Sequence, residues 1–145
     1  DGLQDPGNIG TILRTAEAAG IRDVFMSNQC VELYNPKLVR SAMGSLFYLN
    51  ISRHNLIQKA QQLQEQGYTL IATALNGENF FGRAPVKNKV AVIIGNEGNG
   101  ISDELLAIAD KVYTLPIRGK AESLNAAVAA GIILYNLVFE HNTEV

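Results

Sequence analysis

Three short segments of the sequence place glycines beside polar side chains that could serve a ligand. The first is Asp5-Pro6-Gly7-Asn8-Ile9-Gly10 with Arg14, the second covers 94–101 (IGNEGNGI), and the third covers 115–125 (LPIRGKAESLN). Glycines let a ligand reach the backbone N–H groups, because no side chain stands in the way. A carboxylate inside such a turn, Glu97, is costly unless it has a partner such as an arginine. The segments suggest a site built from backbone amides and a few polar side chains.

The second segment has the glycine spacing G-x-x-G-x-G, formed by Gly95, Gly98 and Gly100. This spacing is neither the dinucleotide-binding fingerprint nor a phosphate-binding loop with its Lys-Ser/Thr ending. Nicotinamide-dependent and ATP-dependent chemistry are therefore disfavoured. A glycine-rich turn between a strand and a helix can also be purely structural.

The other candidate residues have structural interpretations as well. Arg14 can be a solvated arginine on a helix, and Asn8 can be a turn residue. Ser123 and Asn125 can simply open the last helix. No residue among them establishes a function by itself.

The three segments are joined by helices and strands that alternate along the chain. Helices are predicted where apolar residues recur at a spacing of three or four, and strands where short runs favour β-structure. The predicted helices are 5–19, 36–42, 55–66, a short one capped by Ser102, and 124–139; the predicted strands are 24–27, 46–51, 68–75, 89–94 and 111–115, with a loop at 76–88. The helix at 55–66 has the clearest amphipathic stripe, so we expect it to lie on a sheet face.

This alternation predicts an α/β domain with a layered, mostly parallel sheet and helices on both faces. Ligands bind such sheets beyond the carboxyl ends of the strands, which is where the second and third segments begin. The last helix, 124–139, is apolar nearly all round. Such a helix must be buried on two sides, and we expect one side to pack on the sheet and the other on a second subunit.

Length and composition limit the classes of protein that fit. The 145 residues predict one domain, and 47% hydrophobic against 18% charged residues exclude disorder. Because the protein has a net charge of −2, any nucleic acid would have to bind a local basic patch on it. The apolar runs are too short for a membrane span, so a cytoplasmic location is expected. The start at Asp1 suggests that residues have been removed upstream.

Cysteine and histidine are scarce, which argues against disulfides and a protein-built metal centre. Cys30 is the only cysteine, and His54 and His141 are the only histidines. We expect Cys30 to be a buried or inert thiol. Both histidines are expected at the surface, away from the three segments.

Taken together, the segments resemble the three motifs of the SpoU-type (TrmH-like) RNA 2′-O-ribose methyltransferases, a branch of the SPOUT superfamily. The resemblance covers nearly the whole chain, and three separated motifs in the right order make it specific. Residues 41–47 (SAMGSLF) also resemble the stretch that precedes an inner strand in this family. The matching positions are Asn8, Gly10, Arg14 and Ala16 in the first motif, Gly95, Glu97, Gly98, Gly100 and Ile101 in the second, and Pro116, Gly119, Ser123, Leu124 and Asn125 in the third.

The resemblance implies a C-terminal trefoil knot, an obligate homodimer, and S-adenosylmethionine bound in a bent form inside the knot. RNA, ribosomal or transfer, would meet a basic patch, and Arg14 would act across the dimer interface. The residues so assigned are Asn8, Arg14, Glu97, Ser123 and Asn125 for catalysis, Ala74, Leu75, Ile94, Gly95, Asn96, Gly98, Gly100, Leu115, Ile117, Ser123 and Leu124 for the cofactor, and Arg14, Arg40 and Arg118 for RNA.

Family members normally have a strand before the first motif, and many carry a separate N-terminal RNA-binding domain. We therefore expect residues 1–145 to be a catalytic domain that lacks both.

Methyl transfer to a ribose hydroxyl requires alignment of three atoms and removal of a proton. In the family, the arginine matching Arg14 has been proposed as the base, but a guanidinium pKa above about 12 makes it a poor base at neutral pH. Our hypothesis is that Arg14 clamps the RNA phosphate and polarises the hydroxyl, and that Glu97 orients Arg14. Asn8 and Asn125 would hold the ribose and the loops. The alternatives are a non-catalytic RNA- or cofactor-binding member of this fold and a nucleotide-binding oxidoreductase.

Overall fold

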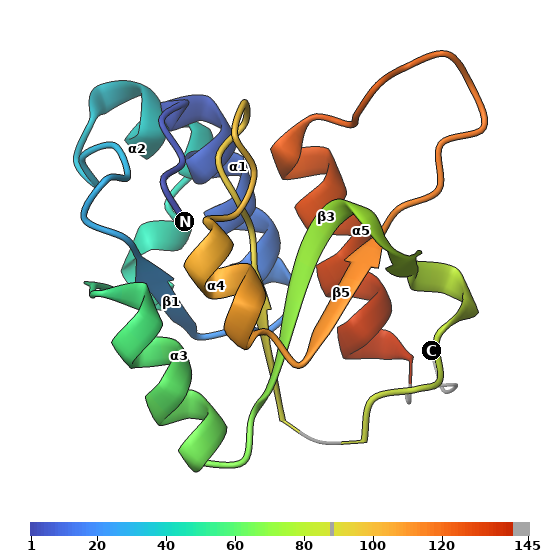
Figure 1. Ribbon diagram of the computed structural model, residues 1–145. Helices are drawn as coiled ribbons and strands as arrows, with labels where there is room; N and C mark the ends of the chain where they lie inside the picture. The colour runs from blue at the N-terminus through green and yellow to red at the C-terminus, as the bar shows by residue number, and fades with distance from the viewer. Residues whose placement is uncertain (88, 141–145) are drawn as a thin grey trace.

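Helices and strands alternate along the chain in the computed structural model, which describes residues 1–87 and 89–140 (Figure 1). The α/β class predicted from the sequence is confirmed. In chain order the elements are α1 (Pro6–Ala18), β1 (Asp23–Met26), α2 (Pro36–Ala42), the 3-10 helix η1 (Ser45–Tyr48), β2 (Asn50–Arg53), α3 (Leu56–Glu65), β3 (Thr69–Asn79), the 3-10 helix η2 (Phe80–Gly82), β4 (Val90–Ile93), α4 (Asp103–Ile108), β5 (Lys111–Thr114) and α5 (Ala126–Phe139).

The strands form two parallel sheets rather than the expected single one. β1 pairs with β2 in one sheet, and the other has the order β4-β3-β5. A cavity of about 850 Å³ is lined by apolar residues of both β1 and β4, together with side chains of α1 and α3. Each of these two strands has one hydrogen-bonded neighbour within the described residues.

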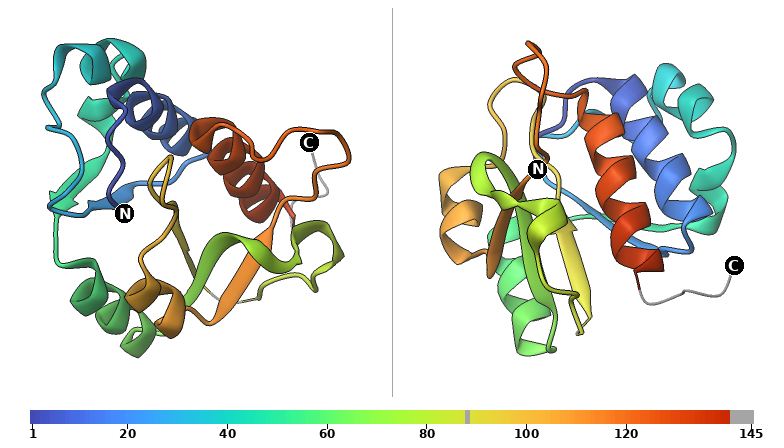
Figure 2. Two further views of the ribbon diagram at one scale, coloured as in Figure 1. Left: turned by 45° about the horizontal axis from the view of Figure 1, so that its top comes forward. Right: turned by 90° about the vertical axis from the view of Figure 1, so that its right-hand side faces the viewer.

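Helices cover the strands on two sides. α1 packs between α2 and α5, and the three helices lie side by side in the right-hand view of Figure 2. α3 and α4 pack against β3 on the other side, which confirms that the helix predicted at 55–66 lies on a sheet. None of the described helices combines the length and apolar character needed to cross a membrane.

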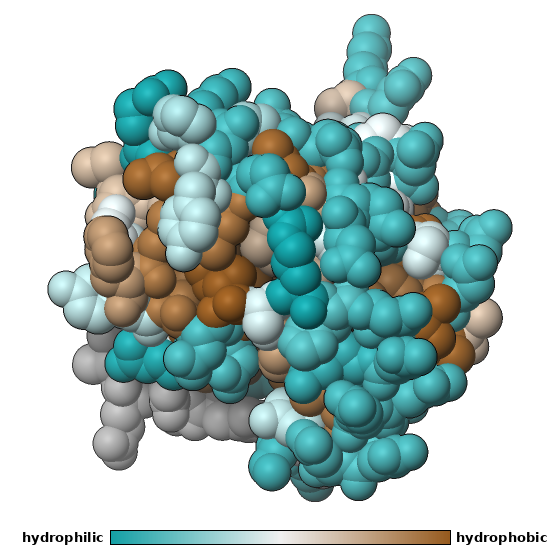
Figure 3. Space-filling model, turned by 90° about the vertical axis from the view of Figure 1, so that its left-hand side faces the viewer, coloured by the Kyte–Doolittle hydropathy of each residue, from teal (hydrophilic) through white to brown (hydrophobic). Residues whose placement is uncertain are grey.

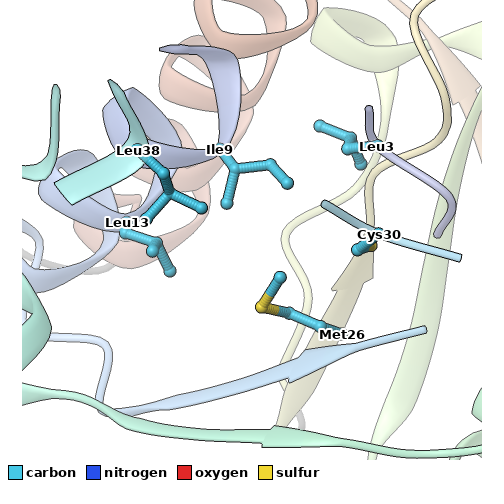
Figure 4. Close-up of a cluster of buried hydrophobic side chains, with 6 residues drawn as sticks. All are labelled: Leu3, Ile9, Leu13, Met26, Cys30 and Leu38. Carbon is cyan, nitrogen blue, oxygen red and sulfur yellow. The ribbon is translucent and has the colours of Figure 1, made fainter. Parts of the chain in front are cut away.

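A buried apolar cluster holds α1 against α2 and β1 (Figure 4). It consists of Leu3, Ile9, Leu13, Met26, Cys30 and Leu38. Ile9 and Leu13 are one helical turn apart, so both point from α1 into this core. Cys30 is buried here as expected, with its Sγ 3.5 Å from the Ser27 Oγ.

The start of α1 follows from local chemistry. The Asp5 carboxylate accepts a hydrogen bond of 2.8 Å from the Asn8 backbone N–H, and Pro6 occupies the first helical turn. Gly10, further along, lets α1 and α2 approach each other closely. A Cβ on Gly10 would lie 2.5 Å from the Leu38 carbonyl oxygen and 2.5 Å from the Ser41 Cβ.

We expect the substitution Gly10→Ala to lower the free energy of unfolding by about 1–3 kcal/mol, because the added methyl group overpacks the α1–α2 contact. Urea denaturation measures this change. Gly131→Ala is the matched control, since a Cβ on that helical glycine would only touch the Thr15 Cγ2 at 3.7 Å. The control should leave stability unchanged or raise it. Equal losses in the two variants would contradict the packing role of Gly10.

Three local predictions were wrong. The strand predicted at 46–51 starts too early: Met43 and Gly44 adopt left-handed conformations (φ 51° and 84°), the 3-10 helix η1 follows, and β2 covers only Asn50–Arg53. β3 extends beyond the predicted end at 75, to Asn79. Ser102 precedes α4 as predicted, but its side chain makes no capping hydrogen bond.

Candidate active site

The three segments meet near the carboxyl ends of adjacent strands. The second follows β4 and the third follows β5, and β3 lies between these two strands. The pairing of β3 with β5 is interrupted, because Thr73 and Glu78 both pair with Tyr113. Residues 74–77 therefore leave the ladder as a bulge, a feature that is common beside active sites. The predicted cofactor residues Ala74 and Leu75 lie in this bulge.

The second segment forms a tight turn after β4. The backbones of Asn96 and Gly100 exchange two hydrogen bonds of 2.9 Å, and the Asn96 Oδ1 accepts the N–H groups of Gly98 (2.8 Å) and Asn99 (2.9 Å). Gly100 has a left-handed φ of 71°. A Cβ on Gly95 would lie 2.3 Å from the Gly100 carbonyl carbon. Only glycine fits at 95, so the turn depends on it.

A chain of hydrogen bonds connects all three segments. The Asn125 Nδ2 donates to the Asn8 Oδ1 at 2.9 Å, and the Asn8 side chain in turn bonds to Glu97. The Glu97 carboxylate also accepts the backbone N–H groups of Asp5 (3.0 Å) and Gln4 (3.2 Å). At the other end, the Asn125 Oδ1 caps α5. This chain fixes where α1, the second turn and α5 begin relative to one another.

The hydrogen bonds to Glu97 change its acidity. Desolvation raises the pKa of this carboxyl, but hydrogen bonds from its own backbone, from the Asp5 and Gln4 backbones and from the Asn8 side chain outweigh burial, so the pKa lies below its ordinary value. Glu97 is therefore ionised at neutral pH, the state in which it accepts all of these bonds.

The substitution Glu97→Gln is expected to reduce stability at neutral pH by an amount that disappears in acid. A depressed folded-state pKa gives stability that is present above the unfolded-state pKa and is lost as pH falls through the folded-state value. Urea denaturation of both proteins across an acidic pH series measures the difference, which should shrink steadily as Glu97 is protonated. A difference that stayed constant with pH would show that the charge of Glu97 plays no part.

The structure does not bring Arg14 to Glu97 within one chain. Arg14 is exposed on α1, and the hydrogen bonds described for Glu97 go to the loop before α1 and to Asn8. Arg40 is exposed on α2, and Arg118 and Ser123 are exposed in the third segment, which projects from the body in Figure 1. In the described residues, then, Glu97 positions a loop rather than an arginine.

The cofactor residues expected from the resemblance lie in the bulge and in the turns after β4 and β5. Leu75 is 75% exposed and Leu124 is 41% exposed, which leaves apolar side chains available on two of these loops. Sequence reasoning missed Gly77, whose Cβ would lie 2.6 Å from the Tyr113 carbonyl carbon, so that the bulge requires glycine there. A glycine late in an apolar run is the signal that could have found it.

One expectation about the histidines was wrong. His54 is half-buried and lines a cavity of about 570 Å³ together with Asn96 and Gly100 of the second segment. Its Nε2 lies 2.8 Å from the Ser52 Oγ. His141 lies outside the described residues. Within those residues, no group of three histidine, cysteine or acidic side chains is arranged to hold a metal ion.

Comparisons with known proteins identify the family of the chain. Residues 1–135 match the SpoU rRNA Methylase family. The chain is 41% identical over 137 residues to the 23S rRNA (guanosine(2553)-2′-O)-methyltransferase RlmP of Bacillus subtilis (strain 168). The matched region covers 94% of this chain and 55% of that protein. The chain spans about half the length of the curated relatives it matches.

Solved structures show the same fold. An AdoMet-bound rRNA methyltransferase from Sinorhizobium meliloti matches with a TM-score of 0.89 and 33% identity over 98% of this chain and 54% of that one. The A. aeolicus TrmH/SpoU tRNA modifying enzyme matches with a TM-score of 0.83 and 29% identity over 97% of this chain and 73% of that one. With the family match spanning residues 1–135 and the three motif segments assembled at one end of the sheet, the chain belongs to the SpoU rRNA methylase family.

Proposed function

We propose that this protein transfers a methyl group from S-adenosylmethionine to a ribose 2′-hydroxyl of ribosomal or transfer RNA. The observation that carries the proposal is the hydrogen-bonded chain through Asn125, Asn8 and Glu97, which joins three distant segments at the carboxyl ends of the strands. The similarity to a 23S rRNA 2′-O-methyltransferase supports the reaction and the substrate class. Because the substrate is RNA, we also propose a cytoplasmic location.

The loops at this end of the sheet have the chemistry that S-adenosylmethionine requires. The exposed Gly98 and Gly100 of the second segment leave backbone groups without a covering side chain, while Leu75 and Leu124 offer apolar contact to a purine. When bound there, the cofactor would supply a methyl group activated by its sulfonium. The third segment would close over it, with 115–125 forming part of a trefoil knot. The fold shared with an AdoMet-bound relative supports this placement.

We propose that two copies of the chain assemble through α5 and α1. Val128, Ile132, Tyr135 and Phe139 are all exposed and recur every three or four residues, so they form one uncharged apolar face of α5. An exposed stripe of this kind marks an interaction surface. α5 packs beside α1, which carries Arg14. A second copy docked on this face would place Arg14 of one subunit near the loops of the other.

In this dimer the residues have separate tasks. Asn8, Glu97 and Asn125 hold the loops through the bonds already present in one chain, and Ser123 lies in the loop next to them. Arg14 would bind the phosphate next to the target ribose and donate a hydrogen bond to the reacting hydroxyl, with Arg40 and Arg118 extending the positive surface. The hydroxyl proton would leave to solvent water, because a guanidinium stays protonated in proteins and cannot accept it.

We further propose that residues 1–145 are a catalytic domain whose sheet is completed by one more strand. The cavity that both β1 and β4 border is lined mainly by apolar residues. The Asp1 backbone nitrogen donates to the Ile94 carbonyl at 2.7 Å, and the Gly2 backbone N–H donates to the Ser27 Oγ at 2.8 Å. Residues 1 and 2 thus already bridge the ends of β4 and β1, as the last residues of a central strand would. RNA-binding domains separate from 1–145 would then refine the choice of RNA.

Methyl transfer from radiolabelled S-adenosylmethionine to total RNA tests the proposal, followed by mapping of the modified nucleotide. Calorimetry with S-adenosylhomocysteine and with NAD is the companion measurement. Affinity for S-adenosylhomocysteine with incorporation of label supports a methyltransferase. The same affinity without incorporation into any RNA would identify a non-catalytic binding protein, and affinity for NAD alone would identify an oxidoreductase.

A further inference from the structure

We propose that α2 and η1 present a surface on which bases of single-stranded RNA stack beside the target nucleotide. The proposal rests on the RNA methyltransferase function proposed above and adds where and how the RNA is held. The residues concerned, here called the α2–η1 surface, are Tyr34 shortly before α2, Lys37 and Arg40 on α2, Met43 directly after it, and Phe47 and Tyr48 on η1.

The first observation is the exposure of large apolar side chains. Phe47 is 86% exposed, Tyr48 is 65% exposed and Tyr34 is 82% exposed. Aromatic rings of this size normally contribute to a core, so three of them in solvent within 34–48 point to a binding surface. Figure 3, which views the molecule from the side that carries α2, shows apolar side chains gathered on that face beside polar ones. Flat exposed rings suit the faces of nucleobases, because every base can stack on them.

The second observation is the local charge. The protein has a net charge of −2, yet the stretch 33–64 contains four basic residues and neither aspartate nor glutamate. Two of the four serve the fold: Arg53 donates to backbone carbonyls of the 27–31 loop, and Lys59 lies over the Phe25 ring. Lys37 and Arg40 on α2 are exposed and form no ion pair among residues 1–87 and 89–140. They are available to phosphates that flank stacked bases.

The third observation is position. α2 and η1 both pack against α1, so the α2–η1 surface lies next to the helix that carries Arg14, the residue proposed to hold the target phosphate. Its chemistry also differs from that of the α5 face formed by Val128, Ile132, Tyr135 and Phe139. The α5 face has no charged residue and suits a second copy of the chain, whereas the α2–η1 surface is cationic and suits a polyanion.

The test is binding of a fluorescein-labelled uridine oligoribonucleotide to the full chain. Phe47→Ala should weaken binding about 5- to 150-fold, the range for loss of one stacked base. Phe47→Trp should restore affinity, because tryptophan also stacks. Arg40→Gln should reduce the slope of log K against log salt by about one, while Phe47→Ala should leave that slope unchanged. The matched control is Phe81→Ala, which removes an exposed phenylalanine on η2. This variant should bind RNA with the affinity of the parent protein.

Two further measurements separate the possible failures. Sedimentation shows whether Phe47→Ala changes the oligomeric state, and a change there would assign the surface to contact between copies and overturn the proposal. Undiminished RNA affinity of Phe47→Ala, in a protein that binds S-adenosylhomocysteine and methylates RNA, would also overturn it while leaving the proposed function intact. Failure of the proposed function would appear instead in the unsubstituted protein, as absence of both activities.

Discussion

Replacing Arg14 with alanine is expected to reduce methyl transfer to RNA by about 100- to 1000-fold, the usual effect of removing one group that stabilises developing charge. Affinity for S-adenosylhomocysteine should not change, because Arg14 is exposed on α1 and makes no hydrogen bond with the chain of Asn125, Asn8 and Glu97. Arg14→Lys should recover only part of the rate, since lysine keeps the charge but lacks the planar fork. A lysine variant with nearly normal activity would contradict the clamp.

Mixed dimers show whether Arg14 acts across the interface. A dimer of subunits with Arg14→Ala is expected to be nearly inactive, and so is a dimer of subunits whose cofactor loop is disrupted by Gly95→Ala. If Arg14 serves the other subunit, a mixed dimer contains one complete site, made from the intact loops of the first subunit and the arginine of the second. Random mixing should then restore about a quarter of the normal activity. If Arg14 serves its own subunit, both sites are defective and mixing restores nothing.

The sequence predicted most reliably the helices whose ends are marked by capping residues, prolines or glycines. Asp5-Pro6 places a capping side chain before a proline, and α1 begins at Pro6 as this pair predicts. The helix predicted at 36–42 is confirmed as α2. The strand predicted at 46–51 begins only at Asn50, because β-propensity reflects packing on a half-buried sheet and Phe47 and Tyr48 face solvent. No pattern over a few residues reports that β1 and β4 would border a cavity, because that depends on how separate strands pair.

The candidate site was predictable in its members but not in its contacts. A carboxylate in a glycine turn needs a partner, and an arginine was the expected one. Glu97 instead accepts backbone N–H groups of residues 4 and 5, which are more than ninety positions away along the chain. Every residue except proline has a backbone N–H, so residue types do not show which backbone N–H groups Glu97 would bind. The sequence analysis therefore paired Glu97 with Arg14. The hydrogen bond between the Asn8 and Asn125 side chains could not be predicted either, because each amide can serve a turn or a helix cap by itself.

The substitution Gly95→Ala is expected to weaken cofactor binding strongly while leaving the rest of the fold in place. Its Cβ would lie 2.3 Å from the Gly100 carbonyl carbon and 2.4 Å from the Ile101 nitrogen, and both are backbone atoms that cannot rotate away. The turn must therefore open, which breaks the paired hydrogen bonds between Asn96 and Gly100. A clash of this kind costs about 3 kcal/mol, equivalent to about a hundredfold loss of affinity for S-adenosylhomocysteine by calorimetry.

Gly82→Ala is the control for a glycine replaced without a clash, since its Cβ would meet only the Asn79 Cβ at 3.9 Å. Both variants should show the circular dichroism of the parent, but only Gly95→Ala should lose the cofactor. The second turn also positions Glu97, so Gly95→Ala should release the loop at residues 4 and 5 and increase amide exchange there. Normal affinity with normal protection of that loop would mean that the turn tolerates a side chain, and the glycine at 95 would then have no part in building the site.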